Sequence, residues 1–280
     1  MIKIVTDSAS SIAPDVARAA GISIVPMKVA FGDETYIDGV NLDGPGFYQR
    51  LMASRALPAT SQPSAGEFME TLQRLTDDGS EVLCVLISHH LSGTLSSAEA
   101  ARDMLPGRSI HIYNTLSVSI GQGLLCFAAA DMAKAGEPIE AILGHLERLR
   151  SQLRVYFVVD TLEFLQRGGR IGGASALLGT MLKIKPILHI VNGRIEPLEK
   201  VRSKQKAVER MLEIMSENVG PDTPVLAAVG HTNAEAEAAE LEMEMRKRFR
   251  CQRLFVAEAG PTIGTHAGPG VLAIATCPVV

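Results

Sequence analysis

The sequence predicts an α/β fold of two α/β domains, the first a doubly wound, mostly parallel sheet and the second α/β with mixed pairing. Strand-like apolar runs alternate with polar crossovers and helices along the first half, an order typical of a parallel sheet covered on both faces. A length of 280 residues exceeds the usual size of a single hydrophobic core. The regular order of strand, polar crossover and helix ends near residue 154. We therefore expect domains at 1–154 and 155–280, with the ligand at their junction.

The first half contains the alternation on which this fold prediction rests. Its expected elements are strands at 2–6 and 22–25 around a helix at 14–20, a hairpin of 28–31 and 35–37, helices at 43–54 and 64–76, a buried strand at 82–87, a helix at 96–105, a strand at 110–113, an Ala-rich helix after 121–123 and a helix at 137–152. Asp43 and Ser64 are the expected N-caps, and Glu67 completes a capping box with Ser64.

The second half is also predicted to be α/β, with some antiparallel pairing. Asn192-Gly193 is the strongest short hairpin signal in the chain and joins strands at 187–191 and 194–197. The other expected elements are strands at 155–159, 225–229, 254–257 and 271–275 and helices at 203–218 and 234–248. A glycine-rich loop at 260–270, which carries His266, separates the last two strands.

The crossover at 88–94, between the buried strand and the helix after it, is the first candidate for a ligand site. Ligands of open α/β sheets bind outside the carboxyl ends of the strands, and N–H groups at a helix N-terminus favour an anion. Ser92, Gly93 and Thr94 are therefore placed to hold a carboxylate or a phosphate. The alternative is that Ser92 or Thr94 only caps the helix.

Composition and charge argue against several classes of protein. The formal net charge of −4 comes without a basic stripe, so no nucleic-acid partner is expected. Hydrophobic residues make up 46% of the chain, but no run reaches about eighteen apolar residues, so no transmembrane segment is expected. The first residues enter a strand without a signal region, and a cytoplasmic location is the expectation. The four cysteines share no metal spacing and are expected to be reduced and mostly buried.

Common catalytic motifs are absent from the sequence. It contains neither the Gly-x-Ser-x-Gly nucleophile elbow nor the phosphate loop of nucleotide-binding proteins. The dinucleotide-like pattern that begins at Gly268 lies too near the end of the chain for the βαβ unit it needs. Asp7, Asp38, Asp43 and Asp160 have no spacing that supports a metal site, so capping or surface roles are expected.

The histidines and arginines near the polar crossovers have ordinary interpretations as well as functional ones. One member of the His89-His90 pair could act as a base for the crossover serine, although adjacent residues in a turn point in different directions. His266 can donate to an anion or be an exposed loop histidine. Taken alone, Arg170 and Arg202 are solvated cations.

Six motifs, in register along essentially the whole chain, resemble those of the DegV family. They are Asp7-Ser-Ala-Ser, Thr60-Ser-Gln-Pro-Ser64, Leu91-Ser-Gly-Thr94, Asp160-Thr-Leu-Glu-Phe-Leu-Gln-Arg-Gly-Gly-Arg-Ile171, Lys183-Ile-Lys-Pro-Ile-Leu188 and Gly268-Pro-Gly270. The resemblance implies the fatty-acid-binding subunit of a bacterial fatty acid kinase. Two features depart from the family pattern: Asn114 stands where an Asp is expected, and the His89-His90 pair has no place in it.

The resemblance also implies roles for particular residues in holding one long-chain fatty acid, with its carboxylate at the domain junction and its tail buried. Thr60 and Ser92 match hydroxyl donors to the carboxylate, His266 matches a histidine donor, and Arg170 matches the arginine near the head group. The full ligand-binding set implied is Thr60, Ser61, Ser92, Gly93, Thr94, Arg170 and His266.

A partner kinase is the other implication of the resemblance. The kinase would supply ATP and metal, Arg202 would engage it, and the acid would leave as an acyl phosphate for phospholipid synthesis. The chain itself then needs no catalytic residue, no metal and no cofactor. Its contact with a membrane would be at most a transient one with the surface.

The residues support such a site on physical grounds. Each buried CH2 of an aliphatic tail is worth roughly 0.8 kcal/mol, so a tail of about sixteen carbons gains on the order of 10 kcal/mol before ordering costs. A buried carboxylate must still be hydrogen-bonded or neutralised. Hydroxyls, backbone N–H groups and one histidine would do this and leave an oxygen able to attack a phosphate. We expect the uncharged segments 171–182 and 187–191 to line the tail pocket.

Two other functions remain open at this point. A stand-alone serine hydrolase would use Ser92 with His89, His90 or His266, and its turnover of an activated ester would vanish in Ser92→Ala. A non-catalytic regulatory module would bind a small phosphorylated metabolite in a short, polar cavity.

Overall fold

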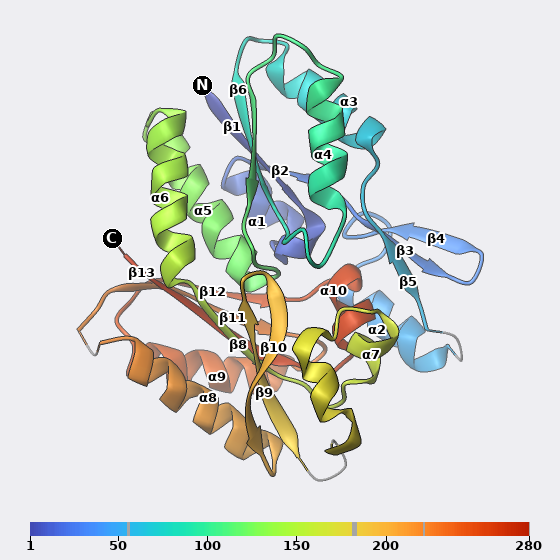
Figure 1. Cartoon of the computed structure of the whole chain (residues 1–280), viewed down its shortest axis with the longest axis vertical. Helices are drawn as coiled ribbons and strands as arrows, with labels where there is room; N and C mark the ends of the chain where they lie inside the picture. Colours follow the sequence, from blue (N-terminus) through green and yellow to red (C-terminus); the bar gives the residue numbers. More distant parts are fainter. Residues whose placement is uncertain (55–56, 181–183, 221, 280) are drawn as a thin grey trace.

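The structure, a computed structural model, describes residues 1–54, 57–180, 184–220 and 222–279. Two large sheets lie one above the other in Figure 1, and a small third sheet lies beside them. The strands of the upper sheet all come from residues before 154, and those of the lower sheet all begin at or after it. Helices cover both faces of the upper sheet and the outer face of the lower sheet.

The upper sheet is parallel, with the strand order β2-β1-β6-β7. Its strands are β1 (Ile2–Asp7), β2 (Ile22–Val25), β6 (Glu81–Leu86) and β7 (Ile110–Asn114). One face is covered by α3 (Ala65–Thr76) and α4 (Thr94–Asp103), and the other by α5 (Ile120–Lys134) and α6 (Ile139–Gln152). Alternate residues of β6 enter the cores on opposite faces, which explains its continuous apolar run. The doubly wound parallel sheet predicted for the first half is confirmed.

The lower sheet has six strands in the order β10-β9-β8-β13-β11-β12, of which only the neighbours β11 and β12 pair in parallel. Its strands are β8 (Arg154–Val158), β9 (Lys185–Val191), β10 (Arg194–Val201), β11 (Val225–His231), β12 (Cys251–Glu258) and β13 (Leu272–Pro278). The helices α8 (Lys204–Asn218) and α9 (Glu235–Arg248) cover its outer face (Figure 1). The mixed pairing predicted for the second half is confirmed.

The small antiparallel sheet has the order β4-β3-β5 and lies beside the junction of the two large sheets (Figure 1). Its strands are β3 (Lys28–Phe31), β4 (Glu34–Ile37) and β5 (Ala59–Ser61). The remaining helical elements are η1 (Ser8–Ser10), α1 (Pro14–Ala19), α2 (Gly44–Ala53), α7 (Glu163–Arg167), η2 (Gly172–Thr180) and α10 (Pro261–Ala267). Helix α2 packs on α10, and the buried hydroxyl of Tyr48 donates to the carbonyl of Ala259.

The two N-caps that the sequence predicts, Asp43 and Ser64, are confirmed. Asp43 accepts a hydrogen bond from the Gly46 amide at the start of α2. Ser64 and Glu67 form the predicted capping box at the start of α3. These caps depend only on residues close in the chain, so the sequence is sufficient to predict them.

Three local predictions differ from the structure. His266 lies in the last turn of α10 instead of in a loop, because Pro261 starts a helix and Gly268, at φ 72°, ends it. Helix α4 begins at Thr94, before the expected start, and its N-cap Gly93 offers no side chain to the helix. Strand β5 is missing from the predictions because three residues are too few to show a period.

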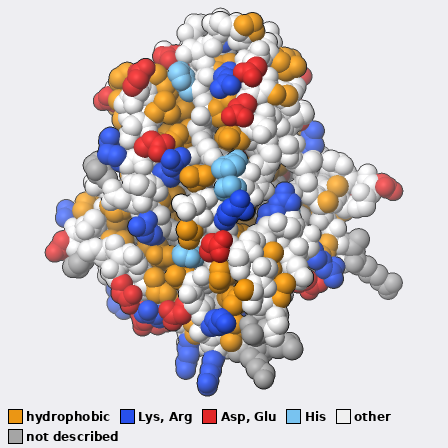
Figure 2. Space-filling model, viewed as in Figure 1, with side chains coloured by type: hydrophobic (Ala, Val, Ile, Leu, Met, Phe, Trp, Pro, Cys, Tyr) orange, Lys and Arg blue, Asp and Glu red, His pale blue; other side chains and the backbone are white. Residues whose placement is uncertain are grey.

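Within the described ranges, no helix has the length and apolar character needed to cross a membrane. The same residues bring together no group of three or more His, Cys, Asp and Glu side chains that could hold a metal ion. All four cysteines are free, and Cys84, Cys126 and Cys277 are buried as predicted, whereas Cys251 is half-buried. On the face shown in Figure 2, basic and acidic side chains are interspersed.

Candidate functional site

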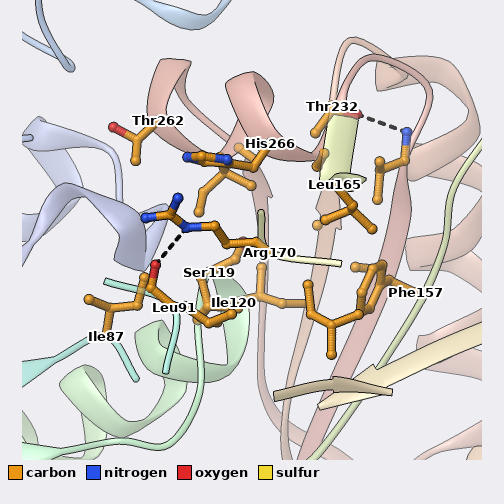
Figure 3. A pocket seen from close by; sticks show the side chains of 18 of the residues that line it. Ile87, Leu91, Ser119, Ile120, Phe157, Leu165, Arg170, Thr232, Thr262 and His266 are labelled. Carbon is orange, nitrogen blue, oxygen red and sulfur yellow. Dashed lines mark hydrogen bonds between the residues drawn. The ribbon is translucent and has the colours of Figure 1, made fainter. Parts of the chain in front are cut away.

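An apolar pocket lies between the carboxyl ends of the parallel strands and the inner face of the six-stranded sheet (Figure 3). Its empty space is about 1010 Å³, part of which opens to solvent. Among its apolar lining residues are Ile87, Leu91, Val118 and Ile120 from the first half of the chain and Val155, Phe157, Ile190, Ile195 and Ala273 from the second.

The place of the pocket follows from the strand order of the parallel sheet. The chain runs outward from β1 to β2 on one side and from β6 to β7 on the other, so the order reverses between β1 and β6. The crossovers that follow these two strands diverge at such a point and leave a crevice. Leu91 and Ser92 of the crossover after β6 line the pocket, together with Ile87 just before it, whereas Gly93 and Thr94 do not.

Polar side chains line the pocket from segments that are distant in the sequence. Thr60 and Ser61 come from β5, Ser92 from the crossover before α4, Arg170 from the turn after α7, and His266 from α10. Pairing of Thr60 with Val29 of β3 fixes the position of β5. Five of the seven residues implied as ligand-binding therefore lie on one pocket.

The closest contact among these side chains joins α10 to β5. Nε2 of His266 lies 2.7 Å from Oγ1 of Thr60. Burial, reinforced by the nearby charge of Arg170, lowers the pKa of His266 to about 4. The ring is therefore neutral near pH 7 and carries a single N–H.

The position of that proton follows from the surroundings of the ring. Nδ1 of His266 is buried and has no hydrogen-bond partner among the described residues. An N–H buried at Nδ1 would be unsatisfied, and a buried donor without an acceptor costs about 1–3 kcal/mol. We therefore place the proton on Nε2, which donates it to Thr60 Oγ1. The hydroxyl proton of Thr60 is then free to point into the pocket.

Ser92 has a similar supporting partner. Its Oγ lies 2.8 Å from Oγ1 of Thr94 and accepts a hydrogen bond from the Thr94 amide at 3.3 Å. Thr94 is fully buried and lies behind Ser92 instead of on the pocket surface. Gly93 also acts indirectly, because a Cβ at this position would overlap the amide of Gln62, which lines the pocket.

A buried carboxylate holds the crossovers in place. Both oxygens of Asp7 accept hydrogen bonds, from the Ala9 amide at 3.0 Å, the Ile87 amide at 3.0 Å and Nε2 of Gln122 at 3.2 Å. Burial raises the pKa of Asp7 to about 6, against these hydrogen bonds, which lower it. Asp7 is the N-cap of η1, which agrees with the capping role expected of it, whereas its complete burial and the near-complete burial of Asp38 rule out a surface position for either. Asp7 thus connects the pocket-lining residue Ile87, which follows β6, to the crossover after β1 and to α5.

Arg170 connects the two halves of the chain across the pocket. Its Nε donates to the carbonyl of Leu91 at 3.0 Å (Figure 3), and its Nη1 donates to the carbonyl of Gly168 at 2.6 Å. The guanidinium thus lies beside the pocket, but two of its donors are already used by backbone groups. Arg170 therefore supplies positive charge near His266, but its guanidinium is not free to bind a carboxylate with two parallel hydrogen bonds.

The other sequence candidates lie outside the pocket. Arg202 is exposed in the bend between β10 and α8 and, within the described ranges, has no ion-pair or hydrogen-bond partner for its side chain. His89 and His90 stack at 3.8 Å between ring centroids, and Nδ1 of His89 lies 2.6 Å from Nδ2 of Asn114. The two departures from the family pattern are thus in contact with each other.

The arrangement needed for a serine hydrolase is not formed by the described side chains. Oγ of Ser92 bonds to Thr94, whereas the ring of His266 bonds to Thr60. Nδ1 of His89 is hydrogen-bonded to Nδ2 of Asn114. No described histidine therefore lies within hydrogen-bond reach of Ser92 as a base.

The walls of the pocket only partly match the sequence prediction. Ile190, from the predicted segment 187–191, lines the pocket, but the described residues 171–179 do not. Ala174 and Leu177 of that segment pack in a core behind the wall, and residues 181 and 182 lie outside the described ranges. The sequence analysis also missed Gln62, Ser119, His231 and Thr232 as lining residues. Of these, His231 ends the buried strand β11 and Thr232 follows it directly, a position at which polar residues signal a site.

Comparisons with known proteins assign essentially the whole chain to one family. The family model described as "Uncharacterised protein, DegV family" matches residues 1–279. Protein DegV of Bacillus subtilis is 36% identical over 277 residues, which cover 99% of this chain and 99% of that protein.

Solved structures of similar chains share the fold. A DegV family protein from Thermus thermophilus, described by its fatty acid binding, is 34% identical, with 99% of both chains covered and a TM-score of 0.94. A stearic-acid-binding protein from Eubacterium ventriosum is 26% identical, with 99% of this chain and 98% of that chain covered and a TM-score of 0.92. With a family match that spans residues 1–279 and a relative of such identity, the chain belongs to the DegV family.

Proposed function

We propose that this protein binds one long-chain fatty acid in the apolar pocket, with the carboxylate at the group formed by Thr60, Ser92 and His266. The observation that carries the proposal is the combination of a strongly apolar cavity with two supported hydroxyls on its surface. The ligands named for the Thermus thermophilus and Eubacterium ventriosum proteins support it. A small phosphorylated metabolite would need a polar cavity, and the walls here are mainly apolar.

The hydrogen-bond pattern suits a carboxylate that must remain reactive. Thr60 and Ser92 each have a partner behind them, so each can donate its own proton to a carboxylate oxygen. Neutral donors satisfy a buried carboxylate without forming a tight ion pair. Ser61 and Arg170 complete the polar part of the pocket, while Gly93 and Thr94 act by placing Gln62 and Ser92.

We further propose that the protein presents the bound acid to an ATP-dependent kinase, which converts it to an acyl phosphate for phospholipid synthesis. In this scheme the chain is a lipid-binding subunit without catalysis, cofactor or metal of its own, located in the cytoplasm, with no nucleic-acid partner and at most transient contact with a membrane surface. The exposed side chain of Arg202, unpaired within the described ranges, supports its assignment to kinase docking. The two sheets support a division into domains at 1–154 and 155–280.

Native mass spectrometry of the purified protein tests the binding proposal. We expect a co-purified mass that matches a fatty acid. We also expect a rise in melting temperature when palmitate or oleate is added, because a ligand at 100 times its Kd stabilises by about 2.7 kcal/mol. Empty protein whose melting temperature does not respond to either acid would refute the proposal.

A further inference from the structure

The apolar pocket shares part of its wall with a second cavity. A groove of about 1290 Å³, part of it open to solvent, is lined by residues of α6, β8, β9 and α8. Val155 and Ile190 line both the pocket and this groove. At this point the two cavities are therefore separated by a partition one residue thick.

The register of the lower sheet places these two residues together. Strands β8 and β9 are antiparallel, and Tyr156 pairs with His189. The next residue on each strand, Val155 and Ile190, therefore stand opposite each other with their side chains on one face. Ile190 is in turn paired with Ile195 of β10. The partition thus belongs to a row of aliphatic side chains across three strands.

The partition lies away from the polar part of the pocket. Side chains alternate along a strand, so Val155 is on the same face as Phe157. In Figure 3 Phe157 lies across the pocket from the guanidinium of Arg170. An extended acid with its carboxylate at Thr60 and His266 would direct the end of its tail toward this side.

The two residues of the partition differ in how firmly they are held. Val155 is 6% exposed and packs on the first turn of α5, where a Cβ on Gly121 would lie 2.6 Å from Cγ2 of Val155. Ile190 is only half-buried, because one side of it borders the open groove. Val155 is therefore fixed by packing, whereas Ile190 packs at the edge of two core clusters and has open space on its groove side.

The groove on the other side is less apolar than the pocket. It is lined by Arg150, Arg154, Glu147, Asn192 and His189, together with apolar residues such as Leu116, Leu198 and Ile214. Arg150 is ion-paired with Glu147 and donates to the carbonyl of Asn114, so these charged groups already have partners. A tail that passed the partition would exchange mainly apolar walls for mixed ones and would lose part of its apolar burial.

We propose that Ile190, supported by Val155, closes the tail end of the pocket and sets the longest acyl chain that the protein accepts. This inference rests on the proposed function and adds a residue that determines specificity. Truncation to alanine removes three carbon atoms from the partition and opens it toward the groove. Two additional methylene groups of a longer acid can then occupy the vacated space.

Competition binding followed by native mass spectrometry tests the inference with an equal mixture of palmitic, stearic and behenic acids. In Ile190→Ala we expect the ratio of stearic to palmitic acid bound to rise by about tenfold over wild type, roughly the worth of the two buried methylene groups by which these acids differ. Ile195→Ala is the matched control, since it removes the same atoms from the paired position and Ile195 lines the pocket but not the groove. We expect it to weaken binding of all three acids without this change in ratio.

A variant in the opposite direction keeps the test independent of any loss of stability. Ile190→Phe extends the partition into the pocket, and we expect it to shift the preference from stearic toward palmitic acid. Equal profiles for Ile190→Ala and Ile195→Ala, or a wild-type protein that takes behenic acid as readily as palmitic acid, would overturn the inference. If the wild type bound none of the acids, the proposed function itself would fail, which is a different result.

Discussion

Nε2 of His266 lies 2.7 Å from Oγ1 of Thr60, so the histidine and the threonine that the sequence suggests as two separate donors form one unit. The neutral imidazole donates its N–H to the hydroxyl, which leaves the hydroxyl proton free for the proposed ligand. The hydrogen bond joins α10 of the second half to β5 of the first. Contact between the halves and the proposed recognition of the carboxylate therefore depend on the same hydrogen bond.

Loss of the Thr60 hydroxyl should weaken acid binding. In Thr60→Ala the carboxylate loses one donor, and the N–H of His266 loses its acceptor. We expect a loss of roughly 1–3 kcal/mol, about 5- to 150-fold in Kd. Titration calorimetry with palmitate measures it. Thr60→Ser keeps the hydroxyl and should bind nearly as well as wild type; equal losses in the two variants would show that the methyl group matters instead.

Ser92 should behave in the same way, through a different supporting residue. Ser92→Ala removes the second hydroxyl donor, and we expect a similar loss of roughly 1–3 kcal/mol in palmitate binding. Thr94 does not line the pocket, but its hydroxyl contacts Oγ of Ser92. Thr94→Val keeps the shape of this buried side chain and should cause a smaller loss than Ser92→Ala. A larger loss in Thr94→Val would mean that Thr94 contacts the acid itself.

The sequence is sufficient for those parts of the fold and site that depend on local patterns. A few neighbouring residues are enough to predict the apolar run of β6, the Asn192-Gly193 hairpin and the capping box at Ser64. The hydroxyl crossover is predictable because strand order and anion binding at helix termini follow general rules.

The rest of the site depends on contacts between distant segments. The resemblance to known proteins points to Thr60 and His266 as separate residues. Their hydrogen bond joins positions 206 apart in the chain, so neither local sequence predicts it. The pocket walls are similar: Ile190 and Ala174 both lie in uncharged segments, yet only Ile190 faces the cavity. Apolar composition identifies segments that can line the pocket, but only the packing of the folded chain determines which of their residues face the cavity.

Gly168 should be required for the position of His266. Its φ of −73° and ψ of −8° suit any residue, but a Cβ would overlap Nδ1 of His266. In Gly168→Ala the imidazole must move away from Thr60, and we expect acid binding to weaken by about 1–2 kcal/mol. Titration with palmitate measures the change.

The neighbouring glycine provides the control for this experiment. Gly169 has φ +70°, and a Cβ added there would meet no other atom within 4 Å, so Gly169→Ala strains the backbone without touching His266. We expect it to lower the free energy of unfolding by about 1–2 kcal/mol and to leave palmitate affinity unchanged. If Gly168→Ala bound palmitate like wild type, the proposed positioning of His266 would be wrong.

The buried imidazole should make stability depend on pH. The pKa of His266 is about 4 in the folded chain, against about 6.5 when unfolded. Between these values the unfolded chain binds a proton that the folded chain does not, so this residue destabilises the fold as pH falls from 6.5 toward 4. Asp7 acts in the opposite direction, because its raised pKa of about 6 makes the folded chain the better proton acceptor between about pH 4 and 6.

A comparison of variants separates the two opposing effects. We expect His266→Gln to gain about 2 kcal/mol relative to wild type when the pH is lowered from about 7.5 to about 4.5. Urea unfolding of both proteins at the two pH values measures this difference, in which the contribution of Asp7 cancels. A stability difference between the two proteins that is the same at both pH values would show that His266 titrates normally.

Arg202 should affect transfer of the acid and not its binding. The side chain is exposed after β10 and does not line the pocket, so Arg202→Ala should leave palmitate affinity within about 0.5 kcal/mol of wild type. With a partner kinase and ATP, we expect acyl phosphate formation to fall at least about tenfold, since loss of a docking contact worth about 1.4 kcal/mol has this effect. Arg250→Ala, which removes another exposed arginine, is the matched control and should change neither quantity. Loss of palmitate binding in Arg202→Ala would place this residue at the ligand site, and unchanged phosphorylation would remove it from the docking surface.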